Sequence, residues 1–392
     1  MKRLLSIIAL GVALLMLIGC TATPATEGPT PQADADDPIK VGLLVAISGA
    51  GGIYGPPTEY VADIAIEEIN EAGGINGRKL ELVITDTASD AQVANEQAKV
   101  LLEKAEVDVI FMQATSAERN AALPVVENTN IMFFYCALYE GGAYSKYLFV
   151  NGDVPPQSVL PVLPYIMDEF DLKDWYIISN DYVWGRETSE IVRAVVNEEG
   201  GTLLAEDYVP LGTSEYSSVI TKIQSLKPDG ISCELIGSDV IAFIKQFHES
   251  GLSGSINVFC FHAIETAVAA MGDTATGLLT PVSYSSFIET EENKQFLEKY
   301  FEKAGKDAQA PDLIVVPTYD AMHLWALAAN KAGSIEAEKV KKEIFDVSFK
   351  GPRGTISYEP ETQHAELPIH LIEWQPDGSA KVIKDFGIIS PK

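Results

Sequence analysis

The sequence predicts an α/β protein with two lobes, each built on a parallel central sheet covered by helices. From Ile39 onward, short apolar segments alternate with longer amphipathic ones, which is typical of repeated strand–helix units. The pattern restarts at Trp175, and 392 residues are more than one hydrophobic core usually organises. Right-handed crossovers between such units make the strands parallel.

In the first half, continuous apolar runs predict strands that are buried on both faces. The first helix ends at Gly73, which favours a helix stop. Ser89 with Gln92, and Thr115 with Glu118, have the spacing of capping boxes at helix starts. The expected strands are 40–47, 80–86, 107–112 and 131–135, and the expected helices are 58–70, 89–104 and one from 115.

The second half repeats this order, and the chain then turns back. The expected strands are 175–179, 202–209, 231–236 and 256–261, with helices from about 185, at 214–226 and at 239–250. Helices 291–303 and 318–332 follow, and then strands 354–358 and 367–374. A chain that builds one lobe, builds a second, revisits the first and finishes in the second has a three-segment hinge. We expect 39–154 and 283–350 in the first lobe, and 155–282 and 351–392 in the second.

The start of the chain is expected to be a lipoprotein signal peptide over residues 1–19. Two basic residues precede an apolar run from Leu4 to Ile18, which is shorter than the ~20 residues of a membrane-spanning helix. The segment that ends at Cys20 resembles a bacterial lipobox, which implies that Cys20 carries lipid. Residues 20–38 hold four prolines and few large apolar residues, so they are expected to form a flexible tether. We therefore expect the body to lie outside the cytoplasm, anchored to the cell membrane only by lipid.

The charge and the cysteine content exclude two further classes of protein. The 56 acidic residues outnumber the 28 basic ones, which gives a formal charge of -28 and excludes nucleic acid as a partner. Beyond Cys20, the cysteines are Cys136, Cys233 and Cys260, too few for a disulfide framework. Cys233 and Cys260 either form one disulfide or remain buried thiols.

Catalytic motifs are missing from the sequence. Gly251 to Ser255 resembles a G-x-S-x-G elbow but lacks the last glycine. The glycines from Gly49 to Gly55 do not have nucleotide-loop spacing, and His248-Glu249 is not followed by the second histidine of a zinc motif. We therefore expect no enzyme activity, no catalytic residues, no cofactor and no metal.

The candidate site lies just beyond the predicted strands, because ligands of open parallel sheets bind at the carboxyl ends of the strands. The segments there are rich in aromatic residues and small hydroxyls, which suit a small polar or amphipathic molecule. Capping alone also explains Thr115 and Ser116, and core packing explains each aromatic taken singly. The candidate ligand-binding residues are Ser116, Tyr182, Thr115, Tyr135, Ala137, Trp184, Tyr54, Glu234, Gly237, Phe261 and His262.

Several segments, in order, resemble type I periplasmic binding proteins of ABC importers. The resemblance is to their leucine/isoleucine/valine-binding group and, most closely, to the amide- and urea-binding branch. It rests on residues 39–48, 66–78, 115–119, 122–125, 139–141, 181–187, 208–212, 323–326 and 363–364.

The resemblance implies two Rossmann-like lobes that close on a ligand. It implies that Ser116 contacts the ligand from the first lobe and Tyr182 from the second, with Tyr135 and Trp184 as neighbouring aromatic positions. Ala137 departs from the branch, which has a threonine there, and Ala114 replaces a bulky aromatic residue. Glu234 departs as well, because the branch usually has a neutral residue there. Glu234 either faces the cleft and favours an amine, or reaches water at the strand end.

We therefore expect a monomeric solute-binding protein that captures a small amide, amino acid or related polar metabolite and delivers it to ABC permease subunits. A surface sensor that passes lobe closure to a membrane receptor is the alternative. An amide hydrolase has no nucleophile–base set to support it.

Overall fold

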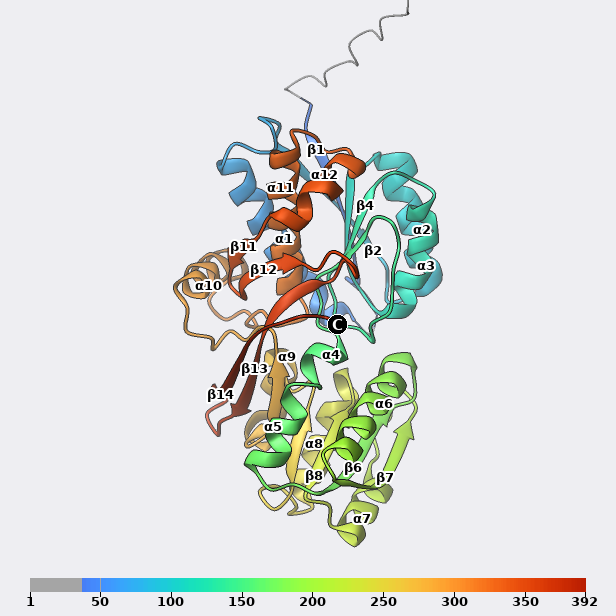
Figure 1. Ribbon diagram of the computed structural model, residues 1–392, viewed down its shortest axis with the longest axis vertical. Helices are drawn as coiled ribbons and strands as arrows, with labels where there is room; N and C mark the ends of the chain where they lie inside the picture. Colours follow the sequence, from blue (N-terminus) through green and yellow to red (C-terminus); the bar gives the residue numbers. More distant parts are fainter. Residues whose placement is uncertain (1–36, 50) are drawn as a thin grey trace, which may run out of the picture. The chain divides into compact units, whose positions relative to one another are not determined.

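The computed structural model describes residues 37–49 and 51–392, so Cys20, the expected signal peptide and nearly all of the expected tether lie outside the described residues. One of its two sheets has five parallel strands in the order β2-β1-β3-β4-β5 (Figure 1). These strands are β1 (Ile39–Val45), β2 (Leu80–Asp86), β3 (Val109–Gln113), β4 (Met132–Tyr135) and β5 (Leu148–Val150). Strands β1, β3 and β4 are almost wholly buried, as their apolar runs predict.

The second sheet has the order β11-β12-β13-β10-β9-β8-β6-β7, with β14 paired to β13. Its strands β7, β6, β8, β9 and β10 run parallel, and β13 pairs antiparallel with β10. The strands are β6 (Asp174–Asn180), β7 (Thr202–Val209), β8 (Gly230–Glu234), β9 (Asn257–Cys260), β10 (Leu279–Val282), β11 (Phe349–Gly351), β12 (Gly354–Tyr358), β13 (Ala365–Trp374) and β14 (Ala380–Ile389). The predicted α/β fold with two parallel sheets is confirmed.

Helices cover both sheets. Those of the first half are η1 (Gly52–Tyr54), α1 (Gly55–Glu71), α2 (Ala91–Lys99), η2 (Val100–Ala105), α3 (Ser116–Glu127), α4 (Pro155–Ser158) and α5 (Val162–Glu169). Those of the second half are α6 (Val183–Glu198), α7 (Ser217–Leu226), α8 (Gly237–Glu249), α9 (Glu265–Met271), η3 (Gly272–Ala275), α10 (Glu291–Ala304), α11 (Val316–Ala332), α12 (Ala337–Glu343) and η4 (Ile344–Asp346). Although α10 and α11 come late in the chain, both pack against α1 (Figure 1).

Of the two predicted capping boxes, one is confirmed and one is wrong. The Thr115 side chain caps α3, and Glu118 accepts a hydrogen bond from the Thr115 backbone N–H at 2.9 Å. At α2 the cap is Asp90, whose carboxylate accepts from the backbone of Gln92 and Val93. A carboxylate at this position is attracted by the helix dipole, whereas Ser89 bonds instead to the loop after β1.

The chain passes between the two sheets three times, and one buried arginine bonds to the first two passages and lies just after the third. Arg353, in the turn between β11 and β12, donates to Asp320 on α11 at 2.6 Å. It also donates to the carbonyl of Asn151, just after β5, at 3.1 Å and to the Ser283 hydroxyl, just after β10, at 3.3 Å. Ser283 in turn donates to Asp153. The passages are therefore held by directional, charge-assisted contacts.

The cysteines in the described part of the chain are free. Cys136, Cys233 and Cys260 are buried thiols. Cys233 and Cys260 are register partners on the neighbouring strands β8 and β9, yet they form no disulfide. Of the two interpretations of this pair, the buried-thiol one agrees with the structure.

Within residues 37–49 and 51–392, no helix combines the length and apolar character required to cross a membrane.

Replacing Arg353 with Met should destabilise the protein strongly. The substitution leaves the carboxylates of Asp320 and Asp153 buried without their cation, and breaking a buried pair in this way costs about 3–5 kcal/mol. Urea unfolding measures the loss. Lys350→Ala is the matched control, since Lys350 is in β11 of the same hairpin but pairs with Glu292 at the surface. An equal loss in both variants would contradict a special role for Arg353.

Candidate functional site

The predicted residues of the first sheet lie at the carboxyl ends of its strands. Ser116 is the first residue of α3, directly after β3 and the cap Thr115. Tyr54 ends η1 after β1, Tyr135 ends β4, and Ala137 follows two residues later. The sequence therefore placed these residues on the correct loops.

The second sheet offers a matching set. Tyr182 is the N-cap of α6 after β6, and Trp184 lies in the first turn of that helix. Gly237 opens α8 with a φ of 56°, a left-handed conformation that favours glycine. Phe261 and His262 follow β9 directly.

Ser116 is bonded to a buried ion pair. Its hydroxyl donates to Glu140 Oε2 at 2.6 Å, and Arg119 Nη2 donates to Glu140 Oε1 at 3.1 Å. The side chains of Arg119 and Glu140 are only 3% and 5% exposed. Such a pair is stable only if its hydrogen bonds are well satisfied, and the Ser116 hydroxyl supplies one of them.

Two tyrosines flank the arginine. The Arg119 guanidinium lies 4.8 Å from the ring centre of Tyr135 and 4.3 Å from that of Tyr139, within the range of cation–π attraction. Tyr135 Oη donates to the carbonyl of Ala114 at 2.8 Å, and Tyr139 Oη contacts His364 Nε2. Burial raises the pKa of Tyr139 to about 12, so both phenols stay neutral near pH 7.

Tyr182, from the second sheet, lies near this first-sheet cluster. Its pKa is raised well above the ordinary value, first by burial and then by the proximity of Glu140 and Tyr135. The charge of Glu140, which accepts the Ser116 hydroxyl, is thus felt at the Tyr182 phenol.

An aromatic group continues from Tyr182. The Trp184 ring centre lies 6.0 Å from that of Tyr182, 6.0 Å from Phe261 and 5.0 Å from His262. His262 is 7% exposed, and burial lowers its pKa to about 4, so its ring is neutral at pH 7. Its Nε2 has no hydrogen-bond partner among the described residues.

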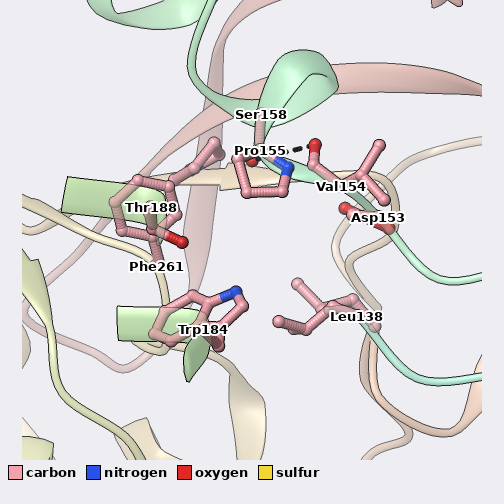
Figure 2. A pocket seen from close by; sticks show the side chains of 10 residues that line it. Leu138, Asp153, Val154, Pro155, Ser158, Trp184, Thr188 and Phe261 are labelled. Carbon is pink, nitrogen blue, oxygen red and sulfur yellow. Dashed lines mark hydrogen bonds between the residues drawn. The ribbon is translucent and has the colours of Figure 1, made fainter. Parts of the chain in front are cut away.

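A small cavity adjoins Trp184, as Figure 2 shows. Trp184, Thr188 and Phe261 face Leu138 across it, and Thr188 is fully buried with an unpaired hydroxyl in the described structure (Figure 2). Ser116 and Tyr182 do not line this cavity. Its full lining is Leu138, Asp153, Val154, Pro155, Ser158, Trp184, Thr188, Phe261, Pro281 and Leu313.

Ala137 is held against the first passage between the sheets. A Cβ atom added at Gly152 would lie only 1.9 Å from the Ala137 carbonyl oxygen, so residue 152 must be glycine for the backbones to approach this closely. The side chain of Ala137 is buried, and it adds no hydroxyl to the site.

Glu234 does not reach water, so that interpretation was wrong. Its side chain is fully buried at the end of β8 and accepts hydrogen bonds from Ser189 and from Ser232, the latter at 3.0 Å. Burial raises its pKa to about 8, so the carboxyl is largely protonated at pH 7. A neutral, hydroxyl-bonded acid is a weak partner for an amine, and the carboxylate at the site is that of Glu140.

Sequence reasoning missed three residues that surround the predicted ones: Arg119, Glu140 and Thr188. The signal for the ion pair was present, because Glu140 follows a strand end and Arg119 lies one turn after Ser116 on α3. The sequence does not indicate that Arg119 and Glu140, which are 21 residues apart, form an ion pair. Among the described residues, no three His, Cys, Asp or Glu side chains group as a metal site.

A family model described as "Periplasmic binding protein domain" matches residues 39–391. The chain belongs to the periplasmic binding protein family. The predicted relationship to the leucine/isoleucine/valine-binding group is confirmed. One similar relative is "Leu/Ile/Val-binding protein homolog 6" of Brucella melitensis, which is 23% identical over 86% of this chain and 87% of the relative. Another is the "Leucine-, isoleucine-, valine-, threonine-, and alanine-binding protein" of Pseudomonas aeruginosa, which is 22% identical over 93% of this chain and 97% of the relative.

Solved structures share the fold of this periplasmic binding protein. An ABC-transporter solute-binding protein of Rhodopseudomonas palustris, in complex with 3,4-dihydroxybenzoic acid, gives a TM-score of 0.81 at 23% identity and covers 91% of this chain and 98% of its own. A branched-chain amino acid transporter substrate-binding protein of Streptococcus pneumoniae, in complex with isoleucine, gives 0.77 at 19% identity, with coverages of 90% and 99%.

Glu234→Gln should flatten the pH dependence of stability. Between the ordinary pKa of 4.5 and the folded value of about 8, the folded state keeps a proton that the unfolded state releases. Stability contributed by this group therefore falls as pH rises from about 5 to 8, by up to about 1.4 kcal/mol per pH unit. Urea unfolding at several pH values should show a shallower fall in the variant. Glu249→Gln, which changes an exposed carboxylate on α8, should keep the wild-type slope; identical slopes for all three proteins would refute the role of Glu234.

Proposed function

We propose that this periplasmic binding protein captures a small polar solute between two lobes and delivers it to the permease subunits of an ABC importer. The observation that carries the proposal is the cavity that Leu138, after β4 of the first sheet, shares with Trp184, Thr188 and Phe261 of the second sheet (Figure 2). Family membership supports a binding role, and catalysis is not part of the proposal.

The proposed lobes are 39–154 with 283–350, and 155–282 with 351–392. Two features support this division: the sheets fall into these ranges apart from the short hairpin strand β11, and α10 and α11 return to pack on α1. The three passages joined by Arg353 would then form the hinge. Ligand would favour the closed form to the extent that it binds that form better than the open one.

The proposed ligand is a small amide, amino acid or related polar metabolite. Both relatives are named for the binding of leucine, isoleucine and valine, and one of them also for threonine and alanine. The two solved structures hold isoleucine and 3,4-dihydroxybenzoic acid. The aromatic side chains Tyr182, Trp184 and Phe261 suit an apolar part of a ligand, and Ser116 and Tyr182 suit a polar part.

Tyr182→Ala should weaken binding at least tenfold. The variant loses both the ring, whose centre lies 6.0 Å from that of Trp184, and a hydroxyl that can bond to a polar ligand group. A panel of amides, amino acids and ureas is screened by thermal shift on the wild type, and the best binders are measured by calorimetry on both proteins. Tyr144→Ala, at a tyrosine that is 63% exposed on a first-sheet loop, is the control. Unchanged affinity in the Tyr182 variant would argue against this site.

We propose further that Cys20 carries lipid and anchors the protein outside the cytoplasm, probed by Cys20→Ser. The serine oxygen cannot receive the thioether-linked lipid, so the full-length variant should move from the detergent-soluble membrane fraction to the aqueous fraction. Cys136→Ser, at a thiol within the body, should keep the membrane location. Equal partitioning of the Cys20 variant and the wild type would exclude the anchor.

A further inference from the structure

We infer that the cavity beside Trp184 is a subsite for one neutral hydroxyl group, which Thr188 and Trp184 hold by hydrogen bonds. A water molecule and a hydroxyl carried by the ligand share this chemistry, and the experiments below distinguish them. The ligand as source rests on the proposed function, because it assigns one part of the captured solute to this cavity.

The Thr188 hydroxyl is the group that indicates a partner. Thr188 lies in α6, and a threonine hydroxyl inside a helix commonly donates to the carbonyl four residues earlier. The adjacent Ser189 does so, donating to the Gly185 carbonyl at 2.8 Å. The Thr188 hydroxyl has no hydrogen-bond partner among the described residues, although the residue is fully buried. Because buried hydroxyls are rarely left unpaired, Thr188 indicates a polar group in the space that it faces.

A second polar group of α6 faces the same space. Figure 2 shows that the Thr188 hydroxyl points into the cavity and that the indole nitrogen of Trp184 lies on the cavity side of its ring. The two side chains are neighbours, since residues four apart share one face of a helix. An indole N–H only donates, whereas a threonine hydroxyl donates and accepts. A hydroxyl oxygen between them can therefore accept the indole hydrogen and form one further bond with Thr188.

The cavity has room for one such group. Its free volume is about 20 Å³, and a single water molecule needs about 10–15 Å³ of such room. Ser158, the other hydroxyl of the lining, is already bonded to the Val154 carbonyl at 3.5 Å (Figure 2). The remaining lining is apolar apart from Asp153: Leu138, Val154, Pro155, Phe261, Pro281 and Leu313.

The lining favours a neutral group over an ion. Asp153 is its one ionisable residue among those described, and Ser283 donates to both of its carboxylate oxygens. Asp153 also lies 3.9 Å from the Arg353 guanidinium, so its charge is already balanced and attracts a ligand cation only weakly. The lining holds no lysine, arginine or histidine that could receive an anion. A hydroxyl needs neither charge.

A hydroxyl in this cavity would be enclosed by both sheets. Leu138 follows β4 of the first sheet, whereas Trp184, Thr188 and Phe261 belong to the second. The hydrogen bonds to Trp184 and Thr188 are therefore shielded from water only while the two sides of the cavity are together. A ligand that carries the hydroxyl would bind the closed form better than the open one, which is the condition for a ligand to drive closure.

Pairs of solutes that differ by one hydroxyl test the ligand as the source. The pairs are valine with threonine, phenylalanine with tyrosine, and benzamide with 4-hydroxybenzamide, each titrated by calorimetry on wild type and on Thr188→Val. If the ligand supplies the hydroxyl, the hydroxylated member of at least one pair should bind wild type at least tenfold more tightly, and Thr188→Val should lose this preference. A preference that is absent, or that Thr188→Val keeps, would exclude the ligand and leave water as the source.

Control variants accompany these titrations. Thr221→Val makes the same change at an exposed threonine of α7, whose hydroxyl bonds to the Ser217 carbonyl at 2.8 Å, and it should bind as wild type does. Thr188→Ser keeps the hydroxyl and should keep the preference. Thr188→Ala replaces the valine variant if that variant does not fold.

A crystal structure at a resolution that shows ordered water decides whether the subsite exists. The wild type is crystallised with its tightest-binding solute, or alone if none of the six binds. We expect one oxygen about 2.5–3.2 Å from both Thr188 Oγ1 and Trp184 Nε1. An oxygen that belongs to the solute identifies the ligand as the source, and a separate peak identifies water.

The outcomes separate this inference from the proposed function. A solute bound between the lobes with no oxygen in the cavity would overturn the inference and leave the proposed function standing. An oxygen in the cavity of a protein that binds none of the six solutes would support the subsite, with water as its occupant, and count against the proposed ligand class. No oxygen and no binding would overturn the inference as well.

Discussion

The arrangement of the whole site depends on the contacts of Arg353. This single guanidinium, fully buried, bonds to the first passage at Asn151, to the second at Ser283 and to Asp320 on α11, and Arg353 itself lies just after the third passage. The candidate residues follow strands of the two sheets that these passages connect, so the spacing between the two sets of residues depends on the passages. Charge-assisted hydrogen bonds are directional, so they fix the distance between the passages more precisely than apolar contacts would.

Buried acids recur across this acidic protein, and most are kept neutral or paired. Glu265, at the start of α9, and Asp312, before α11, lie in the two parts of the chain that the second passage connects, and Thr266 donates to Asp312 at 2.6 Å. Burial raises the pKa of Glu265 to about 7 and that of Asp312 to about 6. Glu234 behaves in the same way, whereas Glu140 keeps a cation beside it. The distinction matters for function, because only a carboxylate with a partner remains charged when it is removed from water.

Much of the fold could be predicted from the sequence, because long apolar runs and glycine stops act locally. Strands β5, β10 and β11 were missed since each has only three or four residues, too few for a period to be recognised. The ten-residue strand β14 was missed as well, because it is largely exposed and has no continuous apolar run. Ser89 and Asp90 are adjacent, and either side chain could cap α2. The sequence alone does not say at which of the two residues the helix begins. The loops that hold Ser116, Tyr182 and Trp184 were found because the carboxyl ends of parallel strands share one edge.

The chemistry of the site was harder to predict than its place. Glu234 was singled out because it follows a strand, but the direction of its side chain depends on Ser189, a helix away, and on packing that no local pattern encodes. Ser116 was correctly placed, yet a serine at a helix start donates its hydroxyl equally well to a ligand or to a carboxylate of the protein itself. Which of these occupies the position depends on Glu140, brought there by the loop after β4 and held by Arg119. The place of Ser116 could therefore be predicted from the sequence, whereas its hydrogen-bond partner is decided by a tertiary contact between segments 24 residues apart.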